Sequence, residues 1–346
     1  MRVLLVDTTQ YYPGTPLFLE ALAEMSAERG WDYRFVDEAQ LFRGVRPSLV
    51  QRGIYRLLGR RPLRYWSFNA RLRAVAGDFQ PDVTLVVKGA HVAPATLQWM
   101  SSRTRSVLVN YATDDPFNPA ANTPRILRAI PLYDLYACTK QAILDDVRAA
   151  AARAVTYVPF GYKPSVHFPE EPSTRAERER FGADVSFLGS CDADRVPYMR
   201  ALVRECPESR LRLYGGYWNR YPEFRPFYAG LVLGRAYRLA LGGSRIVINL
   251  VRRANRDGHA MRTFEVPACR AFMLAERTRE HQDLFVEDEE VGYFTGPEEL
   301  VAKVRDYLGR PADRDRMRRA AHGKVTGTGH TYKDRLAEIF ATAGLR

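Results

Sequence analysis

Short apolar segments rich in β-branched residues alternate with segments of helical period along this chain, and this alternation most constrains its fold. In the first half the apolar segments read RVLLVD, YRFVD, VTLVVKG, SVLVNYATD, LYACT and VTYVPFG. The intervening segment TPLFLEALAEMSAERG places Leu17, Ala21, Leu22 and Met25 on one helical face. Apolar strands that alternate with helices indicate a parallel sheet covered on both faces. We therefore predict a doubly wound α/β domain.

The alternation breaks at KPSVHFPEEPSTRAERERFGAD and then resumes. The strands DVSFLGS, LRLYGG, RIVINLV, AFMLAE and VGYFT follow, and we expect a helix around Phe224 to Leu241. A chain of 346 residues exceeds the usual size of one core, so two domains are expected. We predict an N-terminal Rossmann-like domain at 1–165, a linker at 166–183, a C-terminal Rossmann-like domain at 184–330, and a terminal helix at 331–346 that packs back toward the first domain. Two such sheets are expected to face a cleft where ligands bind.

The composition excludes several classes of protein. Apolar residues make up 46% and charged residues 27%, as in ordinary globular proteins. The first apolar run stops at Asp7, which is too early for a secretory signal. The stretch FYAGLVLGRAYRLALGG is interrupted by Arg235 and Arg238, so we expect no transmembrane helix. The four cysteines form no C-x-x-C pair, which predicts reduced thiols in a cytoplasmic protein and no zinc site.

The net charge of +12 predicts affinity for anions such as nucleic acid, an anionic membrane surface or phosphorylated small molecules. Between Glu38 and Asp78 the chain has nine arginines and no acidic residue, with Tyr55, Tyr65, Trp66 and Phe68 interleaved. Phosphate neutralisation together with base stacking would use such a segment in a nucleic-acid-binding protein. The simpler interpretation, which we favour, is a solvated arginine-rich helix pair beside a cleft or a membrane surface.

The segment DVSFLGSCDADRVPYMRAL predicts a strand, a turn at Gly189 and Ser190, and a helix whose first amides can hold a diphosphate. The chain has neither G-x-G-x-x-G nor a phosphate-binding loop of the NTPase type, so no dinucleotide or other cofactor is expected. The triplet at 192–194 is interpreted as helix-start capping rather than as a metal ligand. The histidines show no metal-ligand spacing, and only His259 is placed near a bound donor.

The segment DGHAMRTFEVPACRAFMLAE raises the central functional question. Arg262 and Glu265 share one face of the predicted helix, and Asp257 lies on the loop before it. The guanidinium group can bind phosphate oxygens, and the carboxylate can accept two hydrogen bonds from the vicinal hydroxyls of a ribose. The alternative is an ordinary surface ion pair, and the spacing alone favours that alternative.

A family resemblance favours the functional interpretation. The segments MRTFEVPACRAFMLAERTREHQDLF, EELVAKVRDYLGRPADRDRMRRAAHGKV and HTYKDRLAEIF resemble the C-terminal domain of CgeB-like (spore-maturation protein) glycosyltransferases, which belong to the GT-B class. YDLYACTKQAILDDVRAAAARAVTYVPFGYKPSVHFP and NYATDDPF are similar to N-terminal segments of the same family. One departure is Arg270, which stands where the family usually has glycine.

The resemblance implies two Rossmann-like domains, with a nucleotide-sugar donor in the second, an acceptor in the first, and transfer of a hexosyl or related group without a metal. It implies that Glu265 binds the ribose, that Asp257 contacts the donor sugar, and that Arg262 stabilises the leaving diphosphate. We therefore predict that the donor site contains Gly189, Ser190, Asp257, Gly258, His259, Arg262 and Glu265.

The acceptor side is predicted from the ends of strands in the first half. Asp114 and Asp115 end the strand SVLVNYATD, where a carboxylate can orient an acceptor hydroxyl or take its proton. An Asp-Pro turn that only shapes the loop is the equal alternative. Tyr11 and Tyr12 follow the first strand and suit sugar stacking, although they also fit an ordinary turn.

Two further arginines, Arg60 and Arg61, are assigned to an anionic or membrane-bound acceptor. The sequence thus favours a cytoplasmic, metal-independent GT-B glycosyltransferase, with a nucleotide sugar and an unidentified acceptor as partners. Its rivals are a nucleic-acid-binding protein that uses Arg43 to Arg73 and a catalytically silent sugar-binding relative. Nucleic acid is the less favoured partner.

Overall fold

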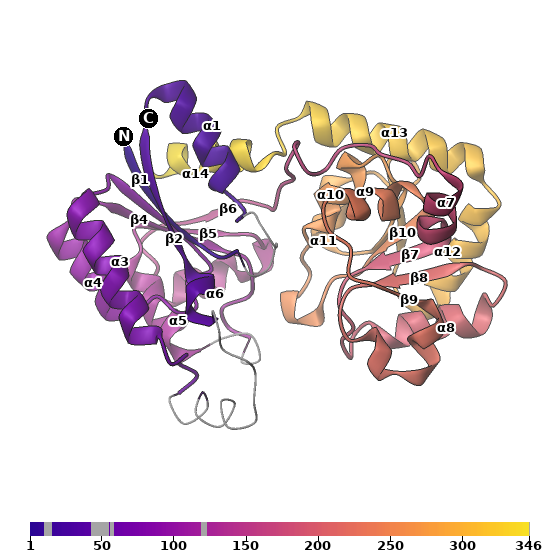
Figure 1. Ribbon diagram of the computed structural model, residues 1–346, viewed down its shortest axis with the longest axis horizontal. Helices are drawn as coiled ribbons and strands as arrows, with labels where there is room; N and C mark the ends of the chain where they lie inside the picture. Colours follow the sequence, from indigo (N-terminus) through magenta and orange to yellow (C-terminus); the bar gives the residue numbers. More distant parts are fainter. Residues whose placement is uncertain (10–15, 43–54, 56–58, 119–122, 346) are drawn as a thin grey trace. The chain divides into compact units, whose positions relative to one another are not determined.

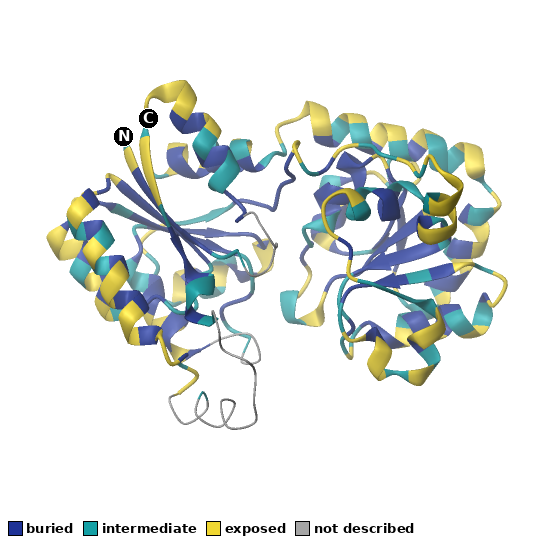
Figure 2. Cartoon of the chain, viewed as in Figure 1, coloured by how far each residue is buried: buried dark blue, intermediate teal, exposed yellow. Residues whose placement is uncertain are grey.

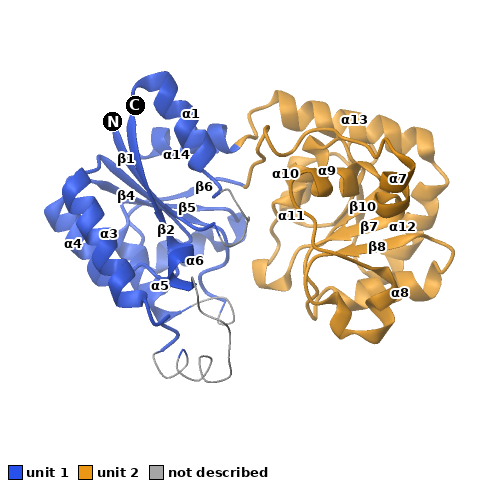
Figure 3. Cartoon of the chain, viewed as in Figure 1, with its two compact units in different colours: residues 1–159, 332–346 blue, residues 160–331 orange. Residues whose placement is uncertain are grey.

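A computed structural model describes the chain except residues 10–15, 43–54, 56–58, 119–122 and 346. The chain divides into two compact units (Figure 3). Unit 1 comprises residues 1–159 and 332–346, and unit 2 comprises residues 160–331. The segment 166–183, predicted to be a linker, therefore lies within unit 2 and includes helix α7 (Arg175–Phe181).

Unit 1 contains a sheet of six strands in the order β2-β1-β3-β4-β5-β6, and all neighbouring strands are parallel (Figure 1). The chain leaves β1 toward one edge of the sheet to form β2 and then returns to form β3 on the other side of β1. The strands are β1 (Arg2–Asp7), β2 (Asp32–Asp37), β3 (Val83–Val87), β4 (Val107–Ala112), β5 (Leu135–Cys138) and β6 (Val155–Tyr157).

Helices cover both faces of this sheet, as the apolar composition of its strands predicts. Figure 1 shows α3 and α4 on one face and α1 with α14 on the other. Helix α14 comes from the end of the chain and packs against α1, so the C-terminus completes the first unit. The helices are α1 (Leu19–Arg29), α3 (Tyr65–Phe79), α4 (Pro94–Arg103), α5 (Pro124–Ala129), α6 (Leu144–Ala149) and α14 (Tyr332–Thr342).

Unit 2 contains a second parallel sheet of six strands, in the order β12-β11-β10-β7-β8-β9. Counted from β7, this is the 3-2-1-4-5-6 order of a Rossmann fold, with its switch point between β7 and β10. The strands are β7 (Ala183–Leu188), β8 (Leu211–Tyr214), β9 (Tyr228–Gly230), β10 (Ser244–Asn249), β11 (Met273–Glu276) and β12 (Gly292–Phe294).

The helices of unit 2 again lie on both faces of the sheet. Helix α8 packs with α12, and α10 packs with α13. Besides α7, the helices are α8 (Val196–Glu205), α9 (Arg235–Gly242), α10 (Arg262–Ala268), α11 (Arg279–Leu284), α12 (Pro297–Leu308) and α13 (Pro311–Gly327). The predicted fold class, α/β with two doubly wound Rossmann-like sheets, is therefore confirmed.

Burial follows the same layers in both units. Figure 2 shows the central strands buried and the outer faces of the helices exposed. In unit 2, Phe187 of β7, Ile248 of β10 and Leu274 of β11 are fully buried and belong to one apolar cluster. Each fully buried side chain of this size contributes roughly 1.5–3 kcal/mol of hydrophobic free energy. These strands therefore fix the position of the loops that follow them.

One expected element is wrong. The helix expected around Phe224 to Leu241 is instead a 3-10 turn (Pro222–Phe227), strand β9 and the shorter helix α9. Pro226 lies inside the 3-10 turn, Gly230 and Gly234 both have positive φ (82° and 54°), and Gly234 immediately precedes α9. Proline and left-handed glycine both prevent a continuous helix, so the apolar period there belongs to an edge strand and one short helix.

In the part of the chain that the structure describes, no helix combines the length and the apolar character that crossing a bilayer requires.

Candidate functional site

The switch point of unit 2 determines where a ligand can bind. Strand β7 leads into α8, and its neighbour β10 leads into α10. The two connections diverge, and ligands of doubly wound sheets bind outside the carboxyl ends of the strands at such a point. Gly189 and Ser190 follow β7, and the predicted donor residues between Asp257 and Glu265 follow β10.

The turn at Gly189 and Ser190 packs tightly against the loop after β8. A Cβ atom placed on Gly215 would lie 2.5 Å from the carbonyl carbon of Gly189 and 2.8 Å from the nitrogen of Ser190. Gly215 also has a φ of 115°, which side chains rarely tolerate. Trp218 Nε1 donates to the Gly189 carbonyl at 2.8 Å. Internal contacts thus fix the position of this turn at the end of β7.

Two arginines lie beside the ring of Phe187 at the end of β7. The guanidinium carbons of Arg195 and Arg262 are 5.1 Å and 5.7 Å from its centroid. Arg195 is only 4% exposed, and its Nη1 donates to the Ser190 carbonyl at 2.7 Å and lies 3.2 Å from Asp192 Oδ2. The Nε atoms of both arginines are buried and have no hydrogen-bond partner among the described residues.

This arrangement concentrates positive charge in a poorly solvated place. Burial, and next the proximity of Arg262, lowers the pKa of Arg195 to about 9. Asp192 offsets part of the charge, and it also accepts from Arg252 Nε at 3.1 Å. Two neighbouring guanidinium groups with buried, unpaired Nε atoms form a site that favours an anion with several acceptor oxygens. Arg195 was not predicted from the sequence, where it reads as an ordinary residue at a helix start.

Glu265 lies on α10, one turn beyond Arg262, and is only 4% exposed. Its Oε2 accepts a hydrogen bond from the Tyr237 hydroxyl at 2.7 Å, and its Oε1 is 3.8 Å from His167 Nε2. Burial, and next the Glu265 carboxylate, raises the pKa of Tyr237 well above its usual range.

The other predicted donor residues lie on the loop before α10. Asp257 is exposed, and its Oδ1 accepts from the backbone nitrogen of Arg279 at 2.8 Å. Gly258 and His259 are buried. His259 Nε2 accepts from the backbone nitrogen of Phe160 at 3.1 Å, and its Nδ1 lies 2.5 Å from Glu280 Oε2. Both ring nitrogens of His259 thus have protein partners, which fix the loop to the start of unit 2.

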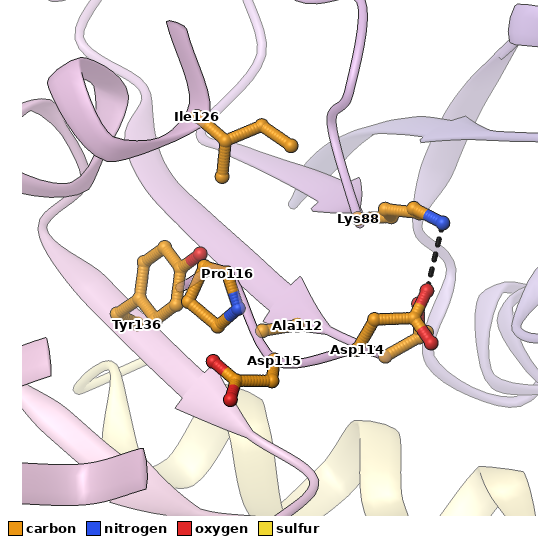
Figure 4. Close-up of a pocket in the computed structure, with 8 residues that line it drawn as sticks. Lys88, Ala112, Asp114, Asp115, Pro116, Ile126 and Tyr136 are labelled. Carbon is orange, nitrogen blue, oxygen red and sulfur yellow. Dashed lines mark hydrogen bonds and ion pairs between the residues drawn. The ribbon is translucent and has the colours of Figure 1, made fainter. Parts of the chain in front are cut away.

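In unit 1 the two predicted carboxylates occupy different environments (Figure 4). Asp114 is partly exposed, and its Oδ2 is 2.7 Å from Lys88 Nζ at the end of β3. Asp115 is 5% exposed, points away from Lys88, and accepts from the backbone nitrogen of Phe117 at 2.8 Å. Asp115 thus accepts a hydrogen bond within its own turn, whereas Asp114 presents a carboxylate beside a cation.

Two lysines missed by sequence reasoning support this loop. Lys88 has a φ of 60°, which is unusual for a residue with a side chain, and brings the end of β3 to Asp114. Lys140 is fully buried and donates to the Thr113 carbonyl at 2.9 Å. Lys140 thus fixes the carbonyl of the residue before Asp114. In the sequence, the only signal of these two residues is an isolated lysine after each strand.

The remaining acceptor predictions have two outcomes. Tyr11 and Tyr12 lie outside the described residues. Arg60 is exposed with a φ of 60°, and Arg61 is half-buried, with its guanidinium carbon 5.6 Å from the Tyr65 ring centroid. The backbone carbonyl of Arg60 accepts from Arg125 Nη2 at 2.8 Å.

Within the described ranges, no group of three or more histidine, cysteine or acidic side chains is arranged to hold a metal ion.

Comparisons with known proteins agree with this fold. Residues 195–341 match the model of a family described as glycosyl transferase-like. The sucrose-phosphate synthase of Thermosynechococcus elongatus superimposes with a TM-score of 0.68 at 10% identity, over 99% of this chain and 98% of that one. HepE of Anabaena in complex with UDP-glucose has a TM-score of 0.66 at 14% identity, with 99% of both chains covered.

A glycosyltransferase from Rickettsia africae has a TM-score of 0.63 at 11% identity, over 99% of this chain and 97% of that one. No curated protein matches the chain by sequence. At such low identity the structural matches show the fold alone, which is the two-domain α/β fold of GT-B glycosyltransferase structures.

Proposed function

We propose that this chain is a glycosyltransferase that transfers a hexosyl or related group from a nucleoside-diphosphate sugar to an acceptor hydroxyl. The observation that carries the proposal is the pair of guanidinium groups at Arg195 and Arg262, whose buried Nε atoms lie beside the end of β7. Carboxyl ends of strands at a switch point are the usual place for a nucleotide in such sheets. HepE, which shares the fold, is described in complex with UDP and with UDP-glucose.

In this proposal unit 2 binds the donor. Arg262 and Arg195 bind the diphosphate, with amides of the turn at Gly189 and Ser190 nearby. Glu265, whose Oε2 accepts from the Tyr237 hydroxyl, binds the ribose hydroxyls, as the family resemblance implies. Asp257 contacts the donor sugar, and Gly258 and His259 fix the loop that carries it.

The reaction breaks the bond between the anomeric carbon and the diphosphate oxygen and forms a bond to the acceptor oxygen. Negative charge grows on the departing diphosphate, where Arg262 and Arg195 stabilise it most strongly. These cations, rather than a metal ion, perform this role in the proposal. Asp114 orients the acceptor hydroxyl or takes its proton, and Lys88 Nζ lies 2.7 Å from its Oδ2. Asp115 supports the same turn.

Several finer assignments belong to the same proposal. The motif from Asp257 to Phe285 supports the CgeB-like branch of the GT-B class, and the match over residues 195–341 supports glycosyl transfer. We assign the donor domain to 184–330 and the acceptor domain to 1–165. The four cysteines are all free and buried, which fits a cytoplasmic enzyme.

A thermal-shift series with UDP-, GDP-, TDP- and CDP-sugars tests the proposal, because a ligand stabilises the folded state by RT ln(1 + [L]/Kd). One nucleotide sugar should raise the melting temperature of the wild type in the presence of EDTA. Transfer or hydrolysis of that donor would exclude the catalytically silent relative. No shift with any of the four donors would contradict the proposal.

The arginine pair makes a sharper test possible. Replacing Arg262 with alanine should weaken binding of the nucleoside diphosphate by about 10- to 100-fold, as expected for a lost charge-assisted hydrogen bond. Binding of the nucleoside alone should not change. Arg200, which pairs with Glu223 on the surface of α8, provides the matched control substitution to alanine. Isothermal titration measures both affinities. An equal loss of affinity for the nucleoside and for the nucleoside diphosphate would show that Arg262 does not bind the diphosphate.

The nucleic-acid rival loses support from the structure. It requires aromatic rings that stack on bases, and the rings of Tyr65 and Phe68, each only 5% exposed, are not available for that. Of the rings of Tyr65, Trp66 and Phe68, only that of Trp66, which is 56% exposed, could reach a base.

A further inference from the structure

The turn before α3 and the first turn of that helix expose two large apolar side chains. Leu63 and Trp66 are each 56% exposed, the highest values among the large hydrophobic residues described in unit 1. Arg60 and Arg64, on the same short stretch, are exposed as well. An isolated exposed leucine needs no explanation, but adjacent exposed leucine and tryptophan side chains among arginines do.

This stretch is held firmly to helix α5. Arg125 of α5 is only 5% exposed and donates from Nη1 to the Gly59 carbonyl at 2.7 Å and from Nη2 to the Arg60 carbonyl at 2.8 Å. Its guanidinium carbon is also 5.3 Å from the Tyr65 ring centroid. These contacts fix the backbone at Gly59 and Arg60, directly before the exposed residues.

The surface keeps a strong positive charge. No acidic residue occurs between Glu38 and Asp78 in the sequence. Arg64 and Arg71 both donate to Gln40, which is neutral, so these contacts do not offset the charge of either arginine. We call Arg60, Leu63, Arg64 and Trp66 the interfacial patch.

We propose that the interfacial patch binds the surface of an anionic phospholipid bilayer. Trp66 and Leu63 enter the boundary between head groups and acyl chains, while the arginines bind lipid phosphates. Tryptophan is favoured at that depth, and cationic residues beside exposed apolar groups characterise interfacial membrane contacts. A nucleic acid would use the arginines and Trp66 but has no use for Leu63, and Tyr65 and Phe68 are buried.

This inference goes beyond glycosyl transfer and does not depend on it, because the contact needs no donor. It places unit 1, which carries Asp114, at a membrane surface. An acceptor held at that surface would reach unit 1 without diffusing through bulk solution.

The experiment is sedimentation of the full chain with vesicles of phosphatidylcholine alone or mixed with phosphatidylglycerol. The wild type should sediment with the vesicles that contain phosphatidylglycerol and should not sediment with those of phosphatidylcholine alone. Changing both Leu63→Ser and Trp66→Ser should weaken binding by on the order of tenfold or more. Changing Arg60→Glu and Arg64→Glu should abolish the preference for anionic lipid. The matched control changes Tyr217→Ser and Leu231→Ser, which are 52% and 69% exposed in unit 2, and should bind like the wild type.

A second measurement tests the proposal with a conservative variant, so that misfolding of the serine variants cannot explain the result. Brominated lipid should quench part of the tryptophan fluorescence of the wild type, and the conservative change Trp66→Phe should remove that quenching. Unchanged quenching in this variant would overturn the proposal. So would equal vesicle binding by the wild type and the Leu63 and Trp66 double variant, or binding of single-stranded RNA without binding of anionic vesicles. Stabilisation by a nucleotide sugar in the same variants reports separately on the donor site.

Discussion

At the scale of single residues, the site in unit 2 is defined by cations that are poorly solvated. Arg195 is buried, its pKa is lowered to about 9, and its neighbour Arg262 is a further cause of that shift after burial itself. A protein that places two guanidinium groups together must offset their repulsion with a carboxylate or with a ligand. Asp192 supplies part of this compensation, and we assign the remainder to the diphosphate of the donor.

A buried acid in unit 1 gives a pH-dependent prediction. Glu38 is 6% exposed, and burial raises its pKa to about 7, although His91 donates its backbone N–H to Oε1 at 2.9 Å and Lys88 lowers the pKa further. Because the folded pKa exceeds the unfolded value near 4.5, the stabilisation is complete below pH 4.5 and is lost as the pH rises toward 7. Against Glu38→Gln, the wild type should lose up to about 3 kcal/mol of unfolding free energy between these limits.

Urea denaturation of both proteins at several pH values measures this difference. His91 has the opposite effect on the pH dependence of stability. Burial, followed by Arg125, lowers its pKa from 6.5 to about 4, so the unfolding free energy that it contributes is lost as the pH falls through 4. This dependence of the unfolding free energy on pH remains in the Glu38→Gln variant and serves as the internal reference. A pH-independent difference between the two proteins would contradict the assignment.

At the scale of elements, the turn between α10 and β11 shows a residue in an unfavourable conformation. The backbone nitrogen of Arg270 donates to the Pro267 carbonyl at 2.8 Å, and that of Ala271 donates to the Val266 carbonyl at 3.2 Å. These two bonds form a Schellman motif, and Arg270 has the left-handed φ of 53° that the motif requires. Arginine thus adopts the backbone conformation of the expected glycine instead of changing the turn.

Replacing Arg270 with glycine should therefore raise the unfolding free energy by about 1 kcal/mol, because glycine adopts positive φ without strain. The exposed side chain makes no described contact that would be lost. Replacing it with alanine, which keeps the strain, is the matched control and should give no gain. Chemical denaturation checks both, and equal stability of the glycine and alanine variants would refute the strain argument.

Elements also mark where prediction from the sequence succeeded and where it failed. Continuous apolar strands such as β1 and β10 were predictable because burial on both faces leaves a run without polar interruptions. Strand β9 was not, because its three residues lie at a sheet edge between turns that contain proline and glycine. The partners of Glu265 were equally hidden, since Tyr237 is 28 residues away in sequence and has no spacing relation to α10.

At the scale of the whole molecule, the chain forms two sheets but returns to its first unit at the end. Helix α14 buries Leu336, Ile339 and Phe340, and the ring of Phe340 lies 5.8 Å from that of Trp31. The last helix of the chain is therefore part of the core of unit 1. The structure identifies α1 as the partner of this helix.

Replacing Phe340 with alanine should destabilise unit 1 by about 3–5 kcal/mol, as for other large buried side chains. Lys333 on the same helix forms an exposed ion pair with Glu28, and its replacement with alanine should have little effect on stability. Hydrogen exchange should show lost protection in residues 1–159 and none in 160–331 for the Phe340 variant. Lost protection in both ranges, or equal effects of the two variants, would contradict this role for α14.

The account as a whole depends on the role of Glu265, and one binding comparison tests it most directly. The nucleoside diphosphate found by thermal shift and its 2′,3′-dideoxy analogue should be titrated into the wild type and into Glu265→Gln, which preserves the volume of the buried side chain. We predict that the wild type prefers the ribose form by well over tenfold, since each hydrogen bond to the carboxylate contributes roughly 1.5–3 kcal/mol, and that the variant loses this preference. If the wild type binds both ligands equally, or the variant retains the full preference, Glu265 does not bind the ribose and the proposed donor site is wrong.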